Sequence, residues 1–122
     1  MNISAAESIV METLWRRHPQ SAEEIIVELQ EEQPWQEATI KTLLNRLLKK
    51  RAIGAKKDGR HYLYWPKVTR TKYLFSQSSG LIDRLFDGRV APFITQFSER
   101  ERLSREDIEE LKRLVRRLEN GR

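Results

Sequence analysis

The spacing of the apolar residues changes once between residues 36 and 65, and this change restricts the possible folds more than any other feature of the chain. In residues 36–49 apolar side chains recur every three or four positions, which places one continuous stripe on an α-helix. After Arg51 they recur at every second position, as in a β-strand. A helix that runs directly into a hairpin is the order expected of the recognition helix and wing of a winged helix. The residues of the helical stripe are Ile40, Leu43, Leu44, Leu47 and Leu48.

The outer face of this predicted helix carries short polar side chains interleaved with cations. Hydroxyl, amide and guanidinium groups donate hydrogen bonds to phosphates and to base edges in a major groove. The alternative interpretation is a solvated helix face, which is common on surface helices. The residues of this outer face are Thr39, Thr42, Asn45, Arg46 and Lys49.

The predicted hairpin consists of two alternating runs that flank Asp58-Gly59. An Asp-Gly pair between such runs indicates a tight type I′ turn, which requires a positive φ at both central residues. Pro66 ends the second strand because it has no N–H to donate. These features favour a wing that contacts DNA, and the alternative is an edge hairpin whose lysines block aggregation. The basic residues near the predicted tip are Lys56, Lys57, Arg60 and His61.

Charge is distributed unevenly along the chain, which has a net charge of +5. Residues 1–35 hold two Lys/Arg against seven Asp/Glu, residues 36–66 hold eight against two, and residues 67–122 hold thirteen against nine. A basic block behind an acidic one is the pattern expected of a localised nucleic-acid face. The composition therefore favours a polyanionic partner over an anionic substrate.

Two capping boxes predict the helices that precede the basic block. Ser4 with Glu7, and Ser21 with Glu24, each form the S-x-x-E pattern in which serine and glutamate bond each other's backbone amides. The helices that follow should end near residues 17 and 32, where Pro19 and then Pro34 interrupt the pattern. With the third helix and the hairpin they predict a mainly α fold.

We assign residues 1–66 to this winged helix-turn-helix domain of three helices and a β-hairpin wing. Trp15, Trp35 and Trp65 are interpreted as core and junction residues, since none lies in a row of exposed aromatics. A domain of this size buries only about 60% of its unfolded surface, so it gains stability from a partner.

Residues 67–122 contain three further segments with helical spacing, the last preceded by Ser104 as a predicted N-cap. Helices with no core of their own usually bury their stripes against the identical stripes of a second chain. We therefore predict a helical dimerisation arm and a homodimer; the alternative is an intramolecular bundle folded back on the first domain. The predicted dimerisation residues are Leu74, Leu81, Leu85, Phe86, Phe93, Ile94, Phe97, Ile108, Leu111, Val115 and Leu118.

Other chemistry has little support in the sequence. The chain has no cysteine, so thiolate metal sites and cysteine nucleophiles are excluded. His18 and His61 lie far apart and lack the spacing of metal-binding pairs. Phosphate-binding loops and nucleophile elbows are absent as well. We expect no metal, no cofactor and no enzymatic activity.

The sequence also lacks the features of a membrane or secreted protein. No apolar run approaches the roughly 18 residues that span a bilayer. The N-terminal segment lacks a basic region followed by an uninterrupted apolar one. We expect a soluble, cytoplasmic protein without a membrane partner.

Particular residues in each predicted element of residues 4–66 resemble the marks of one family. They are Glu7, Val10, Met11 and Trp15 in the first helix, Ser21, Ala22, Glu24 and Ile25 in the second, Thr39, Ile40, Thr42, Leu43, Arg46, Leu47, Lys49 and Lys50 in the third, and Tyr62 and Tyr64 in the wing. In these residues the chain resembles the penicillinase repressor family, the dimeric winged-helix repressors of bacterial β-lactamase and methicillin-resistance operons. The arm is similar through its helix order and its ending SREDIEELKRLV.

This resemblance implies a homodimeric transcriptional repressor bound to palindromic double-stranded operator DNA. The third helix is expected in the major groove and the wing on the neighbouring backbone. The residues expected to read bases are Thr39, Thr42, Asn45 and Arg46, and those expected to contact phosphates are Lys41, Lys49, Lys50, Lys56, Lys57 and Arg60. The rival interpretations are a protein-interaction or RNA-binding module without operator specificity, and a small hydrolase.

The resemblance also implies relief of repression by proteolysis in the arm, at a bond that precedes a phenylalanine. Gln96-Phe97 is the matching position, and the partner would be a regulatory protease or its sensor. Asparagine is the expected residue before this bond, so Gln96 departs from the pattern. Gln36 is a second departure, because the family commonly has a serine or threonine to cap the third helix.

Overall fold

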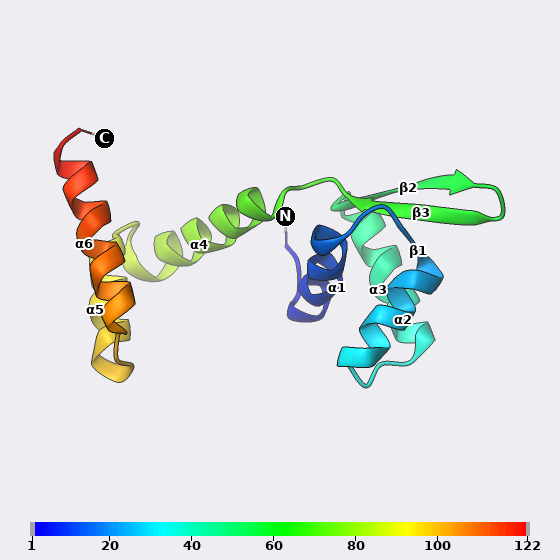
Figure 1. The fold of residues 1–122 in the computed structure, drawn as a ribbon, viewed down its shortest axis with the longest axis horizontal. Coiled ribbons are helices and arrows are strands. Elements are labelled where there is room, and N and C mark those ends of the chain that lie inside the picture. Colours follow the sequence, from blue (N-terminus) through cyan, green and yellow to red (C-terminus); the bar gives the residue numbers. More distant parts are fainter. Residues whose placement is uncertain (1, 122) are drawn as a thin grey trace. The chain divides into compact units, whose positions relative to one another are not determined.

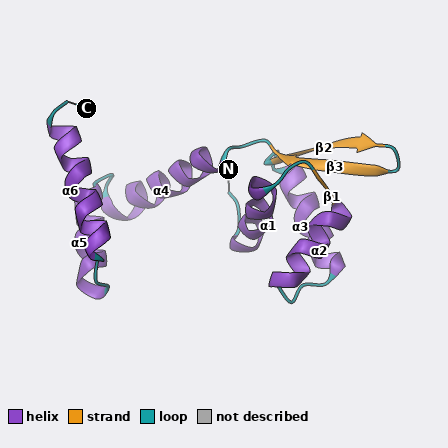
Figure 2. Ribbon diagram, viewed as in Figure 1, coloured by secondary structure: helices purple, strands orange, loops and turns teal. Residues whose placement is uncertain are grey.

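The computed structural model describes residues 2–121, which form helices and a small antiparallel sheet (Figures 1 and 2). The chain divides into two compact units, Met1–Phe75 and Ser76–Arg122. The elements in chain order are α1 (Ala5–Arg16), β1 (Gln20–Ser21), α2 (Ala22–Glu32), α3 (Glu37–Lys49), β2 (Ile53–Asp58), β3 (His61–Pro66), α4 (Arg70–Phe86), α5 (Val90–Arg100) and α6 (Arg105–Glu119).

Both predicted capping boxes are present at the starts of α1 and α2. Ser4 Oγ accepts from Glu7 N at 3.1 Å, and Ser4 N donates to Glu7 Oε1 at 2.8 Å. Ser21 and Glu24 make the same pair of bonds at 3.2 and 2.8 Å. Each box satisfies amide groups that the first helical turn leaves without partners, which is why the short S-x-x-E pattern located both helix starts.

The sheet has three strands in the order β1-β3-β2, all antiparallel. β1 was not predicted, because two polar residues carry no alternating pattern. It pairs Gln20 with Tyr64 and Ser21 with Leu63. Gln20 is fully buried, and its Nε2 donates to the carbonyl oxygens of Thr13 and Arg17 at 3.2 and 2.7 Å. The connection between α1 and α2 is therefore fixed to the hairpin.

The turn of the hairpin differs from its prediction. β2 extends through Asp58, which pairs with His61, so the two central residues are Gly59 and Arg60. Gly59 has a φ of 66°, whereas Asp58 and Arg60 are not among the residues with positive φ. The type I′ turn on Asp58-Gly59 is therefore wrong. Glycine as the first central residue, with a positive φ there alone, is the pattern of a type II′ turn.

The core lies among α1, α2, α3 and the base of the hairpin. Its fully buried members include Leu14, Ile25, Ile40, Leu47 and Ile53. Trp15 and Trp35 pack against this core, as expected. Burying a leucine or isoleucine side chain stabilises the fold by about 1.5–3 kcal/mol, so these apolar stripes supply most of the free energy that holds the first unit together.

The first turns of α4 belong to the first unit. Trp15 Nε1 donates to the carbonyl oxygen of Val68 at 2.9 Å, and its ring lies 5.3 Å from that of Tyr73. Arg70 Nε pairs with Glu12 at 3.0 Å. These contacts account for the end of the first compact unit at Phe75, inside α4.

The second unit contains the rest of α4 with α5 and α6. Ser104 caps α6 as predicted, since its Oγ accepts from Asp107 N at 3.0 Å. Phe86 and Phe93 meet edge to face with ring centroids 5.6 Å apart. Among the described residues, α4, α5 and α6 contribute none to a buried core. The apolar side chains on these helices are exposed or half-buried.

Candidate nucleic-acid interface

The two faces of α3 differ completely in exposure. Ile40, Leu43, Leu44 and Leu47 are buried, and Leu48 at the edge of the stripe is half-buried, which agrees with the predicted stripe. The polar face is free along the whole helix, so it presents a row of donors of the kind that a DNA groove receives. The exposed residues of this face are Thr39, Lys41, Thr42, Asn45, Arg46 and Lys49.

The two ends of α3 are built differently. Gln36 at the N-cap makes no side-chain hydrogen bond, in line with its departure from the family pattern. At the other end Arg51 N donates to Leu48 O and Ala52 N donates to Leu47 O, both at 3.0 Å. These two bonds define a Schellman motif, with Arg51 at φ 63° in the place where glycine is usual. This motif stops the helix and directs the chain at once into β2.

Lys41 shares its surface with acidic neighbours. Its Nζ lies 2.9 Å from Glu37 Oε2, one helical turn away. The hydrogen bond and the charge of Glu37 raise the pKa of Lys41 above its usual value, with a smaller contribution from Glu23. Exposed pairs of this kind add little stability. They do reduce the positive potential near Lys41 relative to that near Lys49, for which no ion pair is found among the described residues.

The basic tip of the wing is exposed, and its lysines point to opposite faces. Lys57 pairs with Tyr62 and Lys56 with Leu63, and paired residues share a face while neighbours alternate. Tyr64 lies two residues beyond Tyr62 on the same face and packs against the core. Lys57 and Tyr62 are therefore on the side of the sheet that faces the helices. The exposed basic residues are Lys56, Lys57, Arg60 and His61.

The base of the wing is held by an aromatic ring over a glycine. Gly54 pairs with Trp65 in the register of the hairpin. A Cβ atom at Gly54 would lie 2.6 Å from Trp65 Cζ2, so only glycine leaves room for the ring. This contact covers the outer face of the hairpin next to the end of α3. Sequence reasoning missed it, although an isolated glycine inside a strand signals a close approach.

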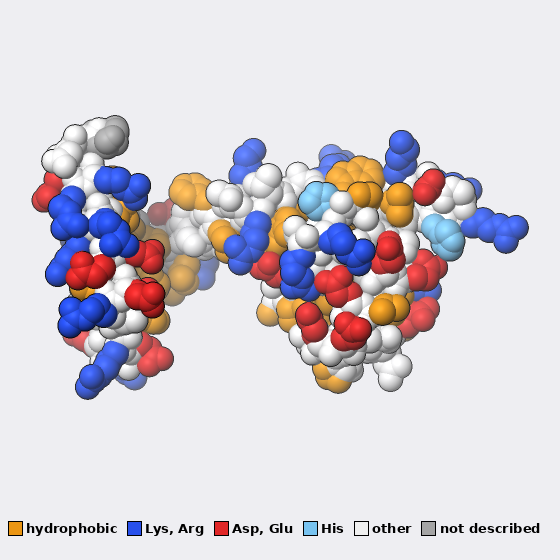
Figure 3. Space-filling model, in the orientation of Figure 1, with side chains coloured by type: hydrophobic (Ala, Val, Ile, Leu, Met, Phe, Trp, Pro, Cys, Tyr) orange, Lys and Arg blue, Asp and Glu red, His pale blue; other side chains and the backbone are white. Residues whose placement is uncertain are grey.

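Acidic side chains gather over α2, whereas basic side chains gather at the free end of the hairpin (Figure 3). The carboxylates of α2 are partly neutralised by α1, with Arg16 2.8 Å from Glu28 and Arg17 3.8 Å from Glu24. His61 Nδ1 lies 3.6 Å from Glu23 Oε2, at the border between the two regions. Like charges would disfavour the approach of the α2 surface to a phosphate backbone, whereas the cations of α3 and the wing would attract one.

Lys50, a predicted phosphate contact, is an exposed residue whose ammonium group is bonded to a buried carboxylate. Its Nζ donates to Glu7 Oε1 at 2.5 Å and to the carbonyl oxygen of Asn2 at 2.6 Å. The side chain of Glu7 is only 1% exposed. Sequence reasoning missed this pair. A signal did exist, because Glu7 lies three and four residues before the buried Val10 and Met11 and therefore on the same helical stripe.

The predicted dimerisation residues lie on α4, α5 and α6. Leu74, Leu85, Phe97, Ile108, Val115 and Leu118 are exposed, and Leu81, Phe86, Phe93, Ile94 and Leu111 are half-buried. The predicted cleavage position lies inside α5, where Gln96 and Phe97 are both exposed. Phe97 O accepts from Glu101 N at 2.9 Å. Cleavage of this peptide bond would therefore require α5 to open.

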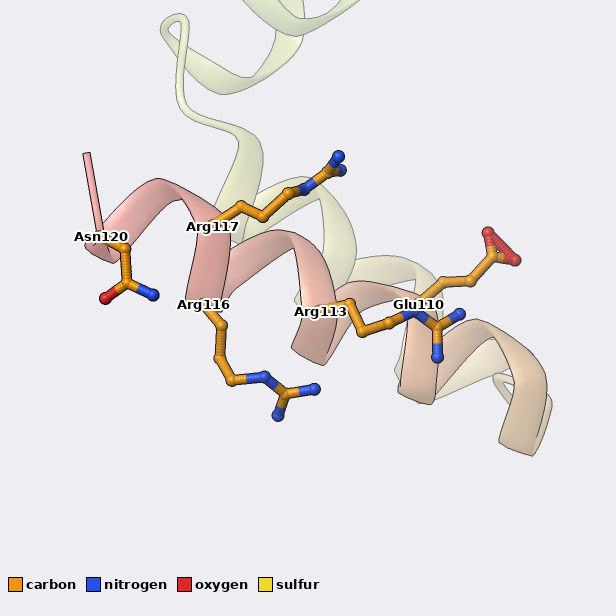
Figure 4. A pocket seen from close by; sticks show the side chains of 5 residues that line it. All are labelled: Glu110, Arg113, Arg116, Arg117 and Asn120. Carbon is orange, nitrogen blue, oxygen red and sulfur yellow. The ribbon is translucent and has the colours of Figure 1, made fainter. Parts of the chain in front are cut away.

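A separate hollow on α6 carries three arginines (Figure 4). Residues of this one helix and its C-cap line it: Glu110, Arg113, Arg116, Arg117 and Asn120. Arg116 and Arg117 lie in the last turn of α6, where the helix dipole favours cations. No set of three His, Cys, Asp or Glu side chains within residues 2–121 is grouped to hold a metal ion. In the same described range, no helix has the length and apolarity needed to cross a membrane.

Comparisons with known proteins agree with this geometry. The sequence model of the penicillinase repressor family matches residues 3–117. The penicillinase repressor of Bacillus licheniformis is 33% identical over 118 residues, which cover 97% of this chain and 92% of the relative. The methicillin resistance regulatory protein MecI of Mammaliicoccus sciuri is 35% identical over 113 residues, which cover 93% of this chain and 92% of the relative.

The winged-helix fold has a solved counterpart. A solution structure of monomeric Bacillus licheniformis BlaI in complex with the blaP half-operator is 37% identical, with a TM-score of 0.54, over 60% of this chain and 89% of that chain. The matches confirm the resemblance, the fold class and the expectation of a non-enzymatic regulator. This chain belongs to the penicillinase repressor family.

Proposed function

We propose that this chain, a repressor by family, binds palindromic operator DNA as a homodimer, with α3 in the major groove and the β2–β3 wing on the adjacent backbone. One observation carries the proposal. The outer face of α3 is exposed along its whole length while its inner face is locked in the core. The solved complex of monomeric BlaI with a half-operator supports one winged helix per half-site. Such a repressor acts on the chromosome and hence in the cytoplasm.

The exposed residues divide into two groups by the contacts they suit. Thr39, Thr42, Asn45 and Arg46 are exposed along the first three turns of α3, from which side chains of a recognition helix reach base edges. Lys49 at the end of α3 and the cations of the wing suit phosphates, which fix position without reading sequence. Lys41 is a weaker phosphate contact because Glu37 competes for its ammonium group. The phosphate-contacting residues are Lys49, Lys56, Lys57 and Arg60, with Lys41 as the weaker member.

The arm holds the two protomers together. Its helices keep large apolar side chains exposed, among them Leu118 at 66% and Leu85 at 61%. Soluble proteins rarely leave contiguous apolar surfaces of this kind without a partner. A second copy presents the same stripes, so a two-fold dimer covers both at once. The dimer then spaces two α3 helices to match the two halves of a palindrome.

Cleavage between Gln96 and Phe97 is the proposed route to derepression, by a regulatory protease. The break would separate α6 from the rest of the arm and remove its stripe, including Ile108 and Val115, from the dimer. Operator occupancy would then fall by mass action, without a change in α3 or the wing.

Footprinting and fluorescence anisotropy with duplexes from the chain's own genomic neighbourhood test the function. We expect protection of a palindrome whose half-sites lie about one DNA turn or a multiple of it apart. Equal affinity for all duplexes, or preference for RNA, would instead identify a protein-interaction or RNA-binding module. A scrambled palindrome of the same length and composition is the control.

A further inference from the structure

Lys49 and Lys50 are neighbours at the end of α3, but their side chains have different surroundings. Lys49 is exposed, and no ion pair joins it to another described residue. Lys50 directs its ammonium group toward the start of the chain, where it bonds Glu7 Oε1 and the backbone of Asn2. Two of its three N–H groups are thereby used within the protein.

The carboxylate of Glu7 is buried, so a nearby cation is required to stabilise its charge. It occupies the inner face of α1 beside Val10 and Met11, and its Oε2 atom is buried without a hydrogen-bond partner. A buried carboxylate is strongly unfavourable unless a charge and hydrogen bonds compensate it. Ser4 N and Lys50 Nζ both donate to Oε1, and Lys50 is the cation within ion-pair distance.

The same contacts join two segments that are distant in sequence. Lys50 is the C-cap of α3, and its own N–H donates to Arg46 O at 3.0 Å. Asn2 precedes Ile3, whose side chain is buried in the core, and Ser4, which caps α1. One ammonium group therefore connects the N-terminal segment, the first turn of α1 and the last turn of α3.

We propose that Lys50 is a positioning residue of the DNA reader: with Glu7 and the backbone of Asn2 it forms a latch that sets the orientation of α3, and it does not neutralise a phosphate. The N-terminal segment is thereby part of the reading machinery. This inference rests on the proposed DNA binding by α3, and it reassigns one residue that the sequence placed among the phosphate contacts.

The latch gives Glu7 a characteristic response to pH. Burial raises the pKa of Glu7, but the hydrogen bonds from Lys50 and Ser4 outweigh it, so the pKa lies below its usual value. The carboxylate thus adds stability above the unfolded-state pKa, and this stability is lost as the pH falls through the folded-state pKa. Without Lys50 the pKa of Glu7 should rise, because the hydrogen bond and the charge of Lys50 both lower it. The stability that a Lys50→Met variant loses as the pH falls should therefore be smaller than the loss in the wild-type protein.

Two matched substitutions separate a latch from a phosphate contact. Lys49→Met should reduce the magnitude of the slope of log K against log salt by about 0.9 per protomer, because one phosphate contact is lost. Lys50→Met should weaken operator binding while leaving the slope at its wild-type value. An equal fall in slope for both variants would overturn the latch and leave the proposed function intact. No change in slope for Lys49→Met would instead contradict the proposed DNA face.

Glu7→Gln tests the latch with every cation of the DNA face in place. A phosphate-contacting Lys50 would be freed by this change, so binding would be unchanged or tighter. A latch predicts weaker binding at an unchanged slope. The double variant Glu7→Gln/Lys50→Met should unfold at a higher denaturant concentration than Lys50→Met alone, because no unpaired buried charge remains. Failure of this rescue, or tighter binding by Glu7→Gln, would refute the latch.

Discussion

The salt dependence of operator binding measures how many phosphates the DNA face neutralises. The cations proposed for this role without an ion-pair partner among the described residues are Lys49, Lys56, Lys57 and Arg60. Each neutralised phosphate contributes about −0.9 to the slope of log K against log salt. Two protomers therefore give a slope near −7, and near −9 if Lys41 contributes despite its pair with Glu37.

Replacing Lys57 with Met tests whether one phosphate contact contributes the expected amount to the salt slope. We expect the slope to become shallower by about 0.9 per protomer, and affinity to fall alike on all sequences, since a phosphate contact carries no base information. Fluorescence anisotropy of a labelled operator duplex over a series of KCl concentrations measures both quantities. Lys112→Met in α6 removes the same charge from a residue outside the proposed face and should leave the slope unchanged. A wild-type slope shallower than about −3 would mean that α3 and the wing are not the DNA face.

Three further predictions test other parts of the molecule. Arg46→Ala should weaken binding to the cognate site by about 1–3 kcal/mol and reduce discrimination among bases; an unchanged preference in competition assays would remove Arg46 from the reading group. Gly54→Ala should lower the free energy of unfolding by about 1–3 kcal/mol in urea titrations, because the new Cβ displaces the Trp65 ring; an unchanged midpoint would show that the ring moves aside at no cost. A chain truncated after Phe75 should stay folded, sediment as a monomer and bind a half-site weakly; a dimer of this fragment would contradict the arm assignment.

Local patterns in the sequence were sufficient to predict most elements. The capping boxes at Ser4 and Ser21 and the apolar stripe of α3 depend only on residues three or four apart, and each was found where it was predicted. The exposed face of α3 followed from the same stripe, since residues opposite a buried stripe face solvent.

The features that were missed depend on contacts between residues distant in sequence. Glu7 and Lys50 are 43 positions apart, and Trp15 and Val68 are 53 apart, so no window along the chain relates them. β1 exists because Gln20 and Ser21 pair with β3, not because of their own strand propensity. The turn was displaced by one residue, since both Asp58-Gly59 and Gly59-Arg60 place glycine at a central position, and only the strand register distinguishes them.

The structure also reduces the number of cations in residues 36–66 that are available to DNA. The eight cations of this basic block include Lys50, whose partner Glu7 lies in the acidic N-terminal block, and Lys41, which is paired with Glu37. The potential that reaches DNA therefore comes from fewer cations than the composition suggests. Binding by one protomer is weak when few phosphates are neutralised, and a dimer doubles that number within one complex. Repression under this proposal depends on the arm as much as on α3, and a single break in α5 relieves it while every DNA-contacting residue stays in place.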